Sequence, residues 1–149
     1  MELALWADCR VMAQDAYMGV YCRRWGVPLI DGGTVRLPRI VGQGRALEII
    51  MTGRKVEAEE CLRIGLCEKV VPKGQARKAT EEMAQEIARF PQACVRADRH
   101  SVYLQQGLTA RAALEQEWIN SIGVVELEGA AGAARFAKGA GRHGDFGIE

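Results

Sequence analysis

The stretch that decides the fold runs from Gly19 to Arg39 and reads GVYCRRWGVPLIDGGTVRLPR. Four glycines and two prolines interrupt it, and it carries a thiol at Cys22, a carboxylate at Asp31 and a pair of adjacent arginines. Glycine lets the backbone adopt positive φ and approach a ligand closely, whereas proline fixes the chain ahead of the turn at Asp31. Such a loop is typical of a segment that positions chemical groups, and a second carboxylate, Glu2, lies upstream of it.

The composition predicts a globular protein with a real core, because 48% of the 149 residues are hydrophobic. The 20 basic and 19 acidic side chains are interspersed, so no overall field favours nucleic acid or an acidic membrane. No apolar run approaches the ~20 residues that cross a bilayer, and the N-terminus does not resemble a signal peptide. The five cysteines lack the spacing of a zinc site. We therefore expect a cytoplasmic protein with reduced thiols and no bound metal.

Periodicity and turn signals divide the chain into a mixed first part and a helical second part. The first part is predicted to contain a helix over 2–8, extended pieces over 9–13 and 17–20, helices over 34–42, 44–52 and 57–64, and a strand over 66–71. Thr34 is the expected N-cap of the helix over 34–42, Thr109 is that of a helix over 109–122, and Gly53 is expected to end the helix over 44–52. The second part is predicted to contain helices over 75–90, 91–107, 109–122 and 126–138, then a loose glycine-rich tail over 139–149.

A series of short motifs resembles the enoyl-CoA hydratase/isomerase (crotonase) family in order and spacing. The motifs are Glu2-Leu3-Ala4, Asp8, Arg10, Gly19, Gly26, Gly32-Gly33-Thr34, Arg36-Leu37-Pro38-Arg39, Gly42, Ala46, Thr52-Gly53-Arg54, Ala58-Glu59-Glu60, Gly65-Leu66 and Val70-Val71-Pro72. Singly each is weak, but together they are specific, and the resemblance extends to Arg135-Phe136-Ala137. The loop is most similar to the subgroup that reads Cys-Arg-Arg-Trp-Gly-Val-Pro-Leu-Ile-Asp-Gly-Gly.

The resemblance implies an α/β fold of the ClpP/crotonase type, of which this chain carries the end of the ββα core and the C-terminal helical region. Residues 1–72 would form the end of the core with the active-site loop. Residues 73–149 would form a helical region that mediates oligomerisation and covers coenzyme A. A complete family member extends further at its N-terminus, so the resemblance also implies a truncated enzyme, whether by a gene fragment, a wrong start codon or a split protein.

The resemblance further implies a lyase or isomerase of fatty acid metabolism that acts on acyl-CoA thioesters. In this family two backbone N–H groups of an oxyanion hole hold the developing enolate oxygen. Coenzyme A would be part of the substrate with no separate cofactor, and the enzyme would be a homotrimer or hexamer without nucleic-acid or membrane partners. One alternative is a non-catalytic crotonase-like subunit that mediates oligomerisation, and another is a helical interaction module unrelated to coenzyme A. Acyl specificity and the choice between hydration and isomerisation stay open.

Two carboxylates are the candidate catalytic groups. Glu2 matches the first glutamate of the family; the alternative is a carboxylate that merely suits the dipole at a helix start. Where hydratases place a second glutamate this chain has Cys22, either a small buried side chain or a thiol activated by Arg23 and Arg24. Asp31 lies in the turn where some relatives, including dienoyl isomerases and dehalogenases, use a catalytic aspartate; alternatively, it bonds its own backbone.

The candidate substrate contacts come from two places in the chain. The adjacent arginines could bind a phosphate or a carboxylated acyl group, or could be solvated surface. Trp25 could line an acyl pocket or belong to the core. Residues near the end resemble the place where family members cover the adenine of coenzyme A, although a cationic glycine-rich tail can also be mobile. The expected contacts are Cys22, Trp25, Gly26, Phe136 and Lys138, with Arg142 beside the last two.

Overall fold

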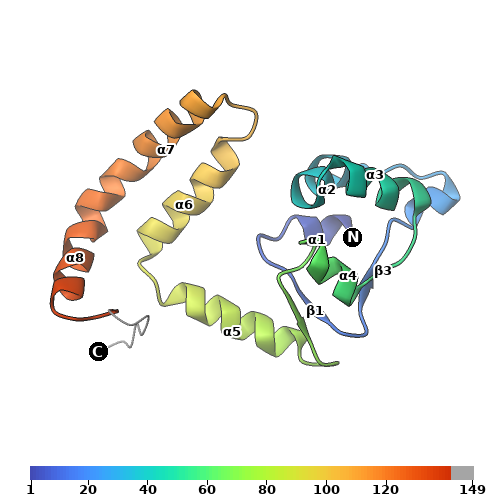
Figure 1. The fold of residues 1–149 in the computed structure, drawn as a ribbon, viewed down its shortest axis with the longest axis horizontal. Coiled ribbons are helices and arrows are strands. Elements are labelled where there is room, and N and C mark those ends of the chain that lie inside the picture. The colour runs from blue at the N-terminus through green and yellow to red at the C-terminus, as the bar shows by residue number, and fades with distance from the viewer. Residues whose placement is uncertain (142–149) are drawn as a thin grey trace. The chain divides into compact units, whose positions relative to one another are not determined.

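The structure, a computed structural model, describes residues 1–141 (Figure 1). By packing, the chain divides into two compact units, Met1–Ala84 and Gln85–Glu149. The division expected between residues 72 and 73 concerns the roles of the two parts and stays a prediction. In chain order the elements are α1 (Glu2–Leu5), β1 (Val11–Ala13), β2 (Tyr17–Met18), η1 (Cys22–Trp25), α2 (Gly33–Val41), α3 (Gln43–Thr52), β3 (Val56–Glu57), α4 (Ala58–Arg63), β4 (Lys69–Val71), α5 (Ala76–Ala88), α6 (Gln92–Leu104), α7 (Ala110–Val124), η2 (Val125–Gly129) and α8 (Ala130–Ala137).

The first unit combines two small sheets with short helices. Strands β1 and β4 are parallel, with Met12 opposite Val70, and β2 and β3 are antiparallel, with Met18 opposite Val56. The side chains that these elements turn inward form one apolar core, whose burial supplies most of the stabilisation of such a unit. The buried core residues are Leu5, Met12, Val20, Leu37, Ala46, Ile49, Val56, Ala58, Cys61, Leu66 and Cys67.

Arg10 ties the beginning of β1 to the beginning of β4. Its guanidinium donates to the Glu68 carboxylate at 2.7 Å and to the backbone oxygens of Leu66 at 2.8 Å and Ala7 at 2.7 Å. Its backbone N–H also donates to Glu68, and the Glu68 N–H donates back to the Arg10 carbonyl at 2.9 Å. Because Ala7 lies two residues after the end of α1, this cluster also fixes α1 next to the sheet.

The helices and the strand expected over 66–71 in the first unit are present, with local differences. The helix expected over 2–8 ends at Leu5. The strand expected over 66–71 is limited to Lys69–Val71. The reason is that the N–H groups of Leu66 and Cys67 both donate to the Cys61 carbonyl, at 2.8 and 3.3 Å, and so close the end of α4. Sequence patterns also missed η1, a single turn of 3₁₀-helix in the loop.

In the second unit, α7, η2 and α8 form one continuous helix, where the sequence predicted two. Thr109 caps α7 as expected, since its hydroxyl accepts from the Ala112 N–H at 3.3 Å. The expected break near residues 123–125 is absent, and a π-helical turn over Val125–Gly129 continues the helix instead.

The continuous helix packs along α6 (Figure 1), and polar contacts join the two. Asn120 donates from Nδ2 to the Ala97 carbonyl at 2.8 Å and to Ser101 Oγ at 2.7 Å. The Glu128 carboxylate, within the π-helical turn, accepts from the N–H groups of Ala93 at 3.3 Å and Cys94 at 3.0 Å. Glu128 thereby satisfies donors at the start of α6, where negative charge is favourable.

Candidate active site

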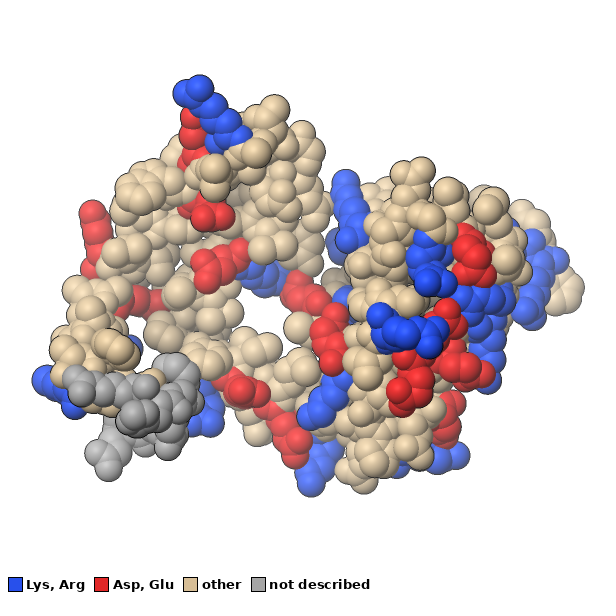
Figure 2. All heavy atoms as spheres, viewed as in Figure 1, with Lys and Arg blue, Asp and Glu red and all other residues tan. Residues whose placement is uncertain are grey.

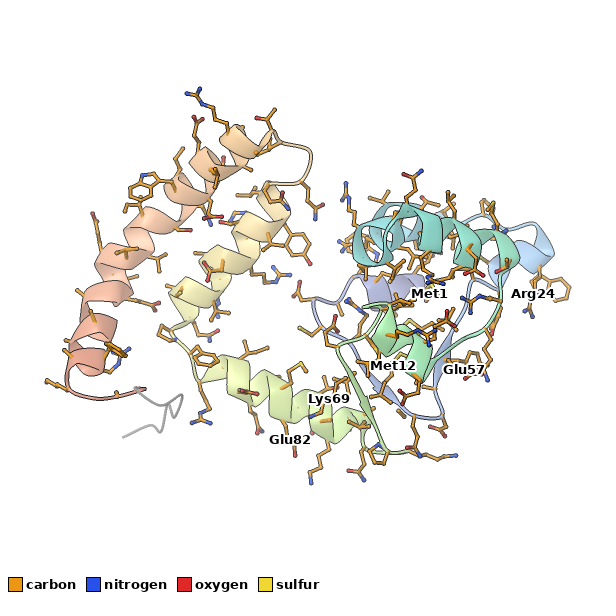
Figure 3. All side chains as sticks on the ribbon, in the orientation of Figure 1. Met1, Met12, Arg24, Glu57, Lys69 and Glu82 are labelled. Carbon is orange, nitrogen blue, oxygen red and sulfur yellow. The ribbon has the colours of Figure 1, made fainter. Side chains whose placement is uncertain are left out.

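A pocket of about 350 Å³ lies in the first unit, where α1, the chain around η1 and the approach to α2 meet. It brings Glu2, Cys22 and Asp31 together from three separate segments. Met1, labelled in Figure 3 beside α1, lines it, whereas Arg24, labelled at the η1 tip, does not. The lining residues are Met1, Glu2, Leu3, Gly19, Val20, Tyr21, Cys22, Leu29 and Asp31.

The Glu2 carboxylate is anchored at the N-terminus of α2. Its Oε1 accepts from the N–H groups of Gly33 at 2.8 Å and Asp31 at 3.1 Å. Glu2 does cap a helix, but the helix is α2 rather than its own, and Glu2 takes the place expected for Thr34. Within residues 1–141 no hydrogen bond holds the second oxygen, Oε2, so it is available for a ligand in the pocket.

Asp31 is exposed and lines the same pocket. Its backbone is held on both sides, because its N–H donates to Glu2 and its carbonyl accepts from the Trp6 indole Nε1 at 2.8 Å. An aspartate that bonds its own turn would occupy the N–H of Gly33, but that N–H donates to Glu2 instead. The Asp31 carboxylate therefore does not accept the Gly33 N–H of its own turn.

The structure adds Tyr21, a pocket residue that sequence reasoning missed. A Cβ at Gly19 would stand 2.7 Å from the Tyr21 ring, so the absence of a side chain at Gly19 makes room for this ring. The Arg24 guanidinium lies over the ring, 4.4 Å from its centroid. An aromatic residue between a glycine and the loop thiol is the signal that could have indicated it.

Arg23 and Arg24 have a role that was not expected. Arg23 donates to the Met51 carbonyl at 2.7 Å and Arg24 to the Gly53 carbonyl at 3.2 Å, so both cations lie at the C-terminal end of α3. A Cβ at Gly53 would stand 2.7 Å from the Arg23 side chain. The two arginines attach η1 to α3, which places the half-buried Cys22 at the pocket wall.

The remaining candidate contacts do not line the pocket. Trp25 is 84% exposed, so the interpretation of Trp25 as a core residue is wrong. Gly26 ends η1 in the left-handed conformation, with φ of 72°. Phe136 and Lys138 are exposed residues of the second unit, and Arg142 lies outside the described residues. Their contacts with substrate stay predictions.

The electrostatic surroundings are mixed in sign. On the face shown in Figure 2, basic and acidic side chains are interspersed rather than gathered by charge. Over residues 1–141 no cluster of three or more histidine, cysteine or acidic side chains is placed to hold a metal ion. In the same part of the chain, every helix falls short of the length and apolar character of a membrane span.

Two cysteines lie in the core rather than at the pocket. Burial raises the pKa of the Cys61 thiol to about 11 and also raises the pKa of the Cys67 thiol.

Comparison with known proteins gives consistent matches. The enoyl-CoA hydratase/isomerase family profile matches residues 1–137. The carnitinyl-CoA dehydratase of Salmonella typhi is 36% identical over 86 residues, which are 58% of this chain and 33% of the relative. The short-chain-enoyl-CoA hydratase of Clostridium acetobutylicum is 33% identical over 101 residues, which are 68% of this chain and 39% of the relative. The crystal structure of an enoyl-CoA hydratase from Bacillus anthracis aligns with a TM-score of 0.82 at 32% identity, covering 89% of this chain and 53% of the other. This chain spans about half the length of such relatives, or less.

Proposed function

The chain belongs to the enoyl-CoA hydratase/isomerase family, and we propose that its pocket serves a lyase or isomerase reaction on an acyl-CoA thioester. The expected α/β, crotonase-like fold is confirmed by the solved relatives. The loop from Cys22 to Gly33 assigns the chain, within this proposal, to the subgroup with that loop sequence.

The observation that carries the proposal is that Glu2 and Asp31 line the same pocket. Glu2 has one oxygen fixed by two backbone donors and the other without a hydrogen bond among residues 1–141. A carboxylate held in this way can remove a proton from C2, the carbon next to a thioester carbonyl, and return it to C4 as the double bond moves from C3–C4 to C2–C3. Backbone N–H groups would have to stabilise the enolate oxygen that develops.

The presence of Cys22 where hydratases have a second glutamate leaves two chemical routes. Water addition needs two acid–base groups, so Asp31 would have to act with Glu2. Double-bond isomerisation needs only a proton shuttle, which Glu2 could provide alone. In either route the acyl-CoA would be contacted by Cys22, Trp25, Gly26, Phe136 and Lys138. Coenzyme A would be part of the substrate rather than a separate cofactor.

We also propose that the protein is a homo-oligomer, a trimer or hexamer. The supporting observation is an exposed apolar row on the continuous helix of the second unit. Leu114 and Trp118 are each 66% exposed and stand one helical turn apart, and the exposed Val125 continues the row. The same observation favours the alternative function, a non-catalytic subunit that contributes only to assembly.

Three substitutions, at Glu2, Asp31 and Cys22, test the chemistry. The Glu2→Gln and Asp31→Asn variants would be assayed for turnover of an enoyl-CoA thioester and for deuterium exchange at C2 of a saturated acyl-CoA in D₂O. If the carboxylates share the work, each substitution should lower the rate about 100-fold or more. If Glu2 acts alone, only Glu2→Gln should do so. Cys22→Ser should have a mild effect, because a neutral thiol is expected to pack rather than react.

The control is Glu117→Gln, the same chemical change on an exposed residue of α7. Unchanged turnover and exchange in Glu2→Gln would overturn the proposed chemistry. A complete loss in Cys22→Ser with no effect of Asp31→Asn would show that the loop residues are wrongly assigned. A protein that self-associates but catalyses neither reaction would support the non-catalytic alternative.

A further inference from the structure

Helix α1 holds residue Asp31 from both sides. Glu2 and Trp6 stand four residues apart, so they project from the same side of one helical turn. Glu2 accepts the N–H of Asp31 at 3.1 Å, and Trp6 donates its indole N–H to the carbonyl of Asp31 at 2.8 Å. The two peptide groups that flank Asp31 are thus both bonded to side chains of α1 and its C-cap residue, Trp6.

The Trp6 indole is held in place by residues of α2 and its cap. Gly32 has φ of 93°, and a Cβ there would lie 3.3 Å from the Trp6 ring, so the ring rests against this turn. The Arg36 guanidinium lies 3.7 Å from the ring centroid, and it donates to the Leu5 carbonyl at 3.2 Å. Because Trp6 remains 55% exposed, the burial of a core side chain does not account for this arrangement.

We propose that Trp6 is a positioning residue, which orients the Asp31 carboxylate relative to Glu2 through its indole N–H. Bonds to both flanking peptide groups restrict the backbone rotations of Asp31 and therefore the direction of its Cα–Cβ bond. A carboxylate displaced by about 1 Å can lose a large part of its catalytic effect. The inference rests on the proposed function for its catalytic consequence. The clamp itself, meaning the two hydrogen bonds by which Glu2 and Trp6 hold the backbone of Asp31, can be tested without that function.

Two substitutions at Trp6 separate the N–H donor from the ring. Trp6→Phe keeps an aromatic ring for Arg36 and removes the donor. Trp6→Gln removes the ring and keeps an N–H donor, whose nitrogen stands as many bonds from Cα as the indole nitrogen. Trp118→Phe, an exposed tryptophan of α7, is the matched control.

The readout is amide hydrogen exchange in the 149-residue chain, followed by NMR. In Trp6→Phe the amides of Asp31 and Gly33 should exchange about five- to tenfold faster, as expected for the loss of one hydrogen bond. The amides of Gln14 and Glu68, which join β1 to β4, should be unchanged. Trp6→Gln should keep most of the slow exchange, and Trp118→Phe all of it. With an enoyl-CoA substrate, Trp6→Phe should lower kcat about tenfold with little change in KM.

Several results would overturn the inference. They are unchanged exchange at Asp31 and Gly33 in Trp6→Phe, an equal acceleration at Gln14 and Glu68, or the same behaviour of the Phe and Gln variants. If neither variant folds, the unmodified chain decides the question. The measurement is then the NMR scalar coupling between the Trp6 indole nitrogen and the Asp31 carbonyl carbon across their hydrogen bond. The absence of this coupling would count against the clamp. If the unmodified chain turns over no thioester, the proposed function fails while the exchange measurements still decide the role of Trp6.

Discussion

At the scale of single residues, the pocket depends on a position that has no side chain. Gly33 is the first residue of α2, and a Cβ there would stand 2.8 Å from Oε1 of Glu2. Such a contact is too short for ordinary packing, so the carboxylate and a side chain at position 33 exclude each other. The end of a glutamate side chain is flexible, and it can move away at little cost to the fold.

We predict that Gly33→Ala separates activity from stability. Alanine favours a helix by up to ~1 kcal/mol over glycine, which offsets the small cost of moving Glu2, so the thermal midpoint should change little. The C2 exchange reaction should fall about tenfold or more, because the carboxylate loses its position. Thermal unfolding and deuterium exchange into acyl-CoA measure the two effects.

The matched control for this prediction is Gly44→Ala, in the first turn of α3. Apart from its chain neighbours and the nearby backbone of its own helix, no atom lies within 4 Å of a Cβ built at Gly44. This variant should therefore gain about 0.5–1 kcal/mol of stability with unchanged activity. Equal activities of the two alanine variants would contradict the role assigned to Gly33.

At the scale of elements, one arginine joins α3 to α4. Arg54 forms paired hydrogen bonds with both carboxylates: with Glu48 of α3 at 2.6 and 2.9 Å, and with Glu60 of α4 at 2.7 and 2.7 Å. These hydrogen bonds lower the pKa of Glu48 and of Glu60 below the ordinary value of 4.5. Planar guanidinium geometry makes such double pairing specific to arginine.

We predict that this cluster contributes to the stability of the fold in a pH-dependent way. Both carboxyl groups bind protons more weakly in the folded than in the unfolded state, so their contribution is complete above pH 4.5 and is lost as the pH falls through the lower folded values. Arg54→Gln should cost about 1–2 kcal/mol at neutral pH, given the partial exposure of the cluster. The difference from the unmodified protein should shrink in acid. Urea unfolding over a pH series measures it.

The control for Arg54 is Arg77→Gln, which breaks an exposed pair with Glu81 on α5. That pair should be worth about 0.5 kcal/mol or less. A constant difference between Arg54→Gln and the unmodified chain across the pH series would contradict the assignment of the acid-sensitive stability to Glu48 and Glu60.

At the scale of the whole molecule, apolar surface remains exposed in the second unit as well as in the first. In the second unit an exposed apolar row lies on the continuous helix and consists of Leu114, Trp118 and Val125. The same helix carries exposed apolar residues on other sides as well. Isolated exposed apolar residues are common, but a continuous row marks an interaction surface. The proposed occupant is a second copy of the chain.

We predict that Trp118→Glu weakens self-association. A buried carboxylate without a partner is costly, so the apparent dissociation constant should rise about tenfold or more. Sedimentation velocity over a concentration series measures it. Gln85→Glu, which adds the same charge at an exposed position of α5, should leave association unchanged. A monomeric unmodified protein at micromolar concentration would contradict the proposed assembly.

The sequence by itself determined those features that depend on near neighbours. Helix ends followed from Gly42 and Gly53, which adopt positive φ at the ends of α2 and α3, and from Thr109, whose hydroxyl caps α7. The family followed from motifs whose spacing is preserved along the chain. Candidate pocket residues Glu2, Cys22 and Asp31 were identifiable for the same reason, because each stands in a recognisable motif.

Only the tertiary structure decided how these groups meet. Glu2 caps α2 in place of Thr34, Trp6 donates to the carbonyl of Asp31, and the arginines of the loop donate to carbonyls at the end of α3. Each of these contacts joins residues 25 to 31 positions apart. Local periodicity carries no information about such pairs, because they form only when α1, the loop and α2 pack around one core and their unpaired backbone groups must find partners.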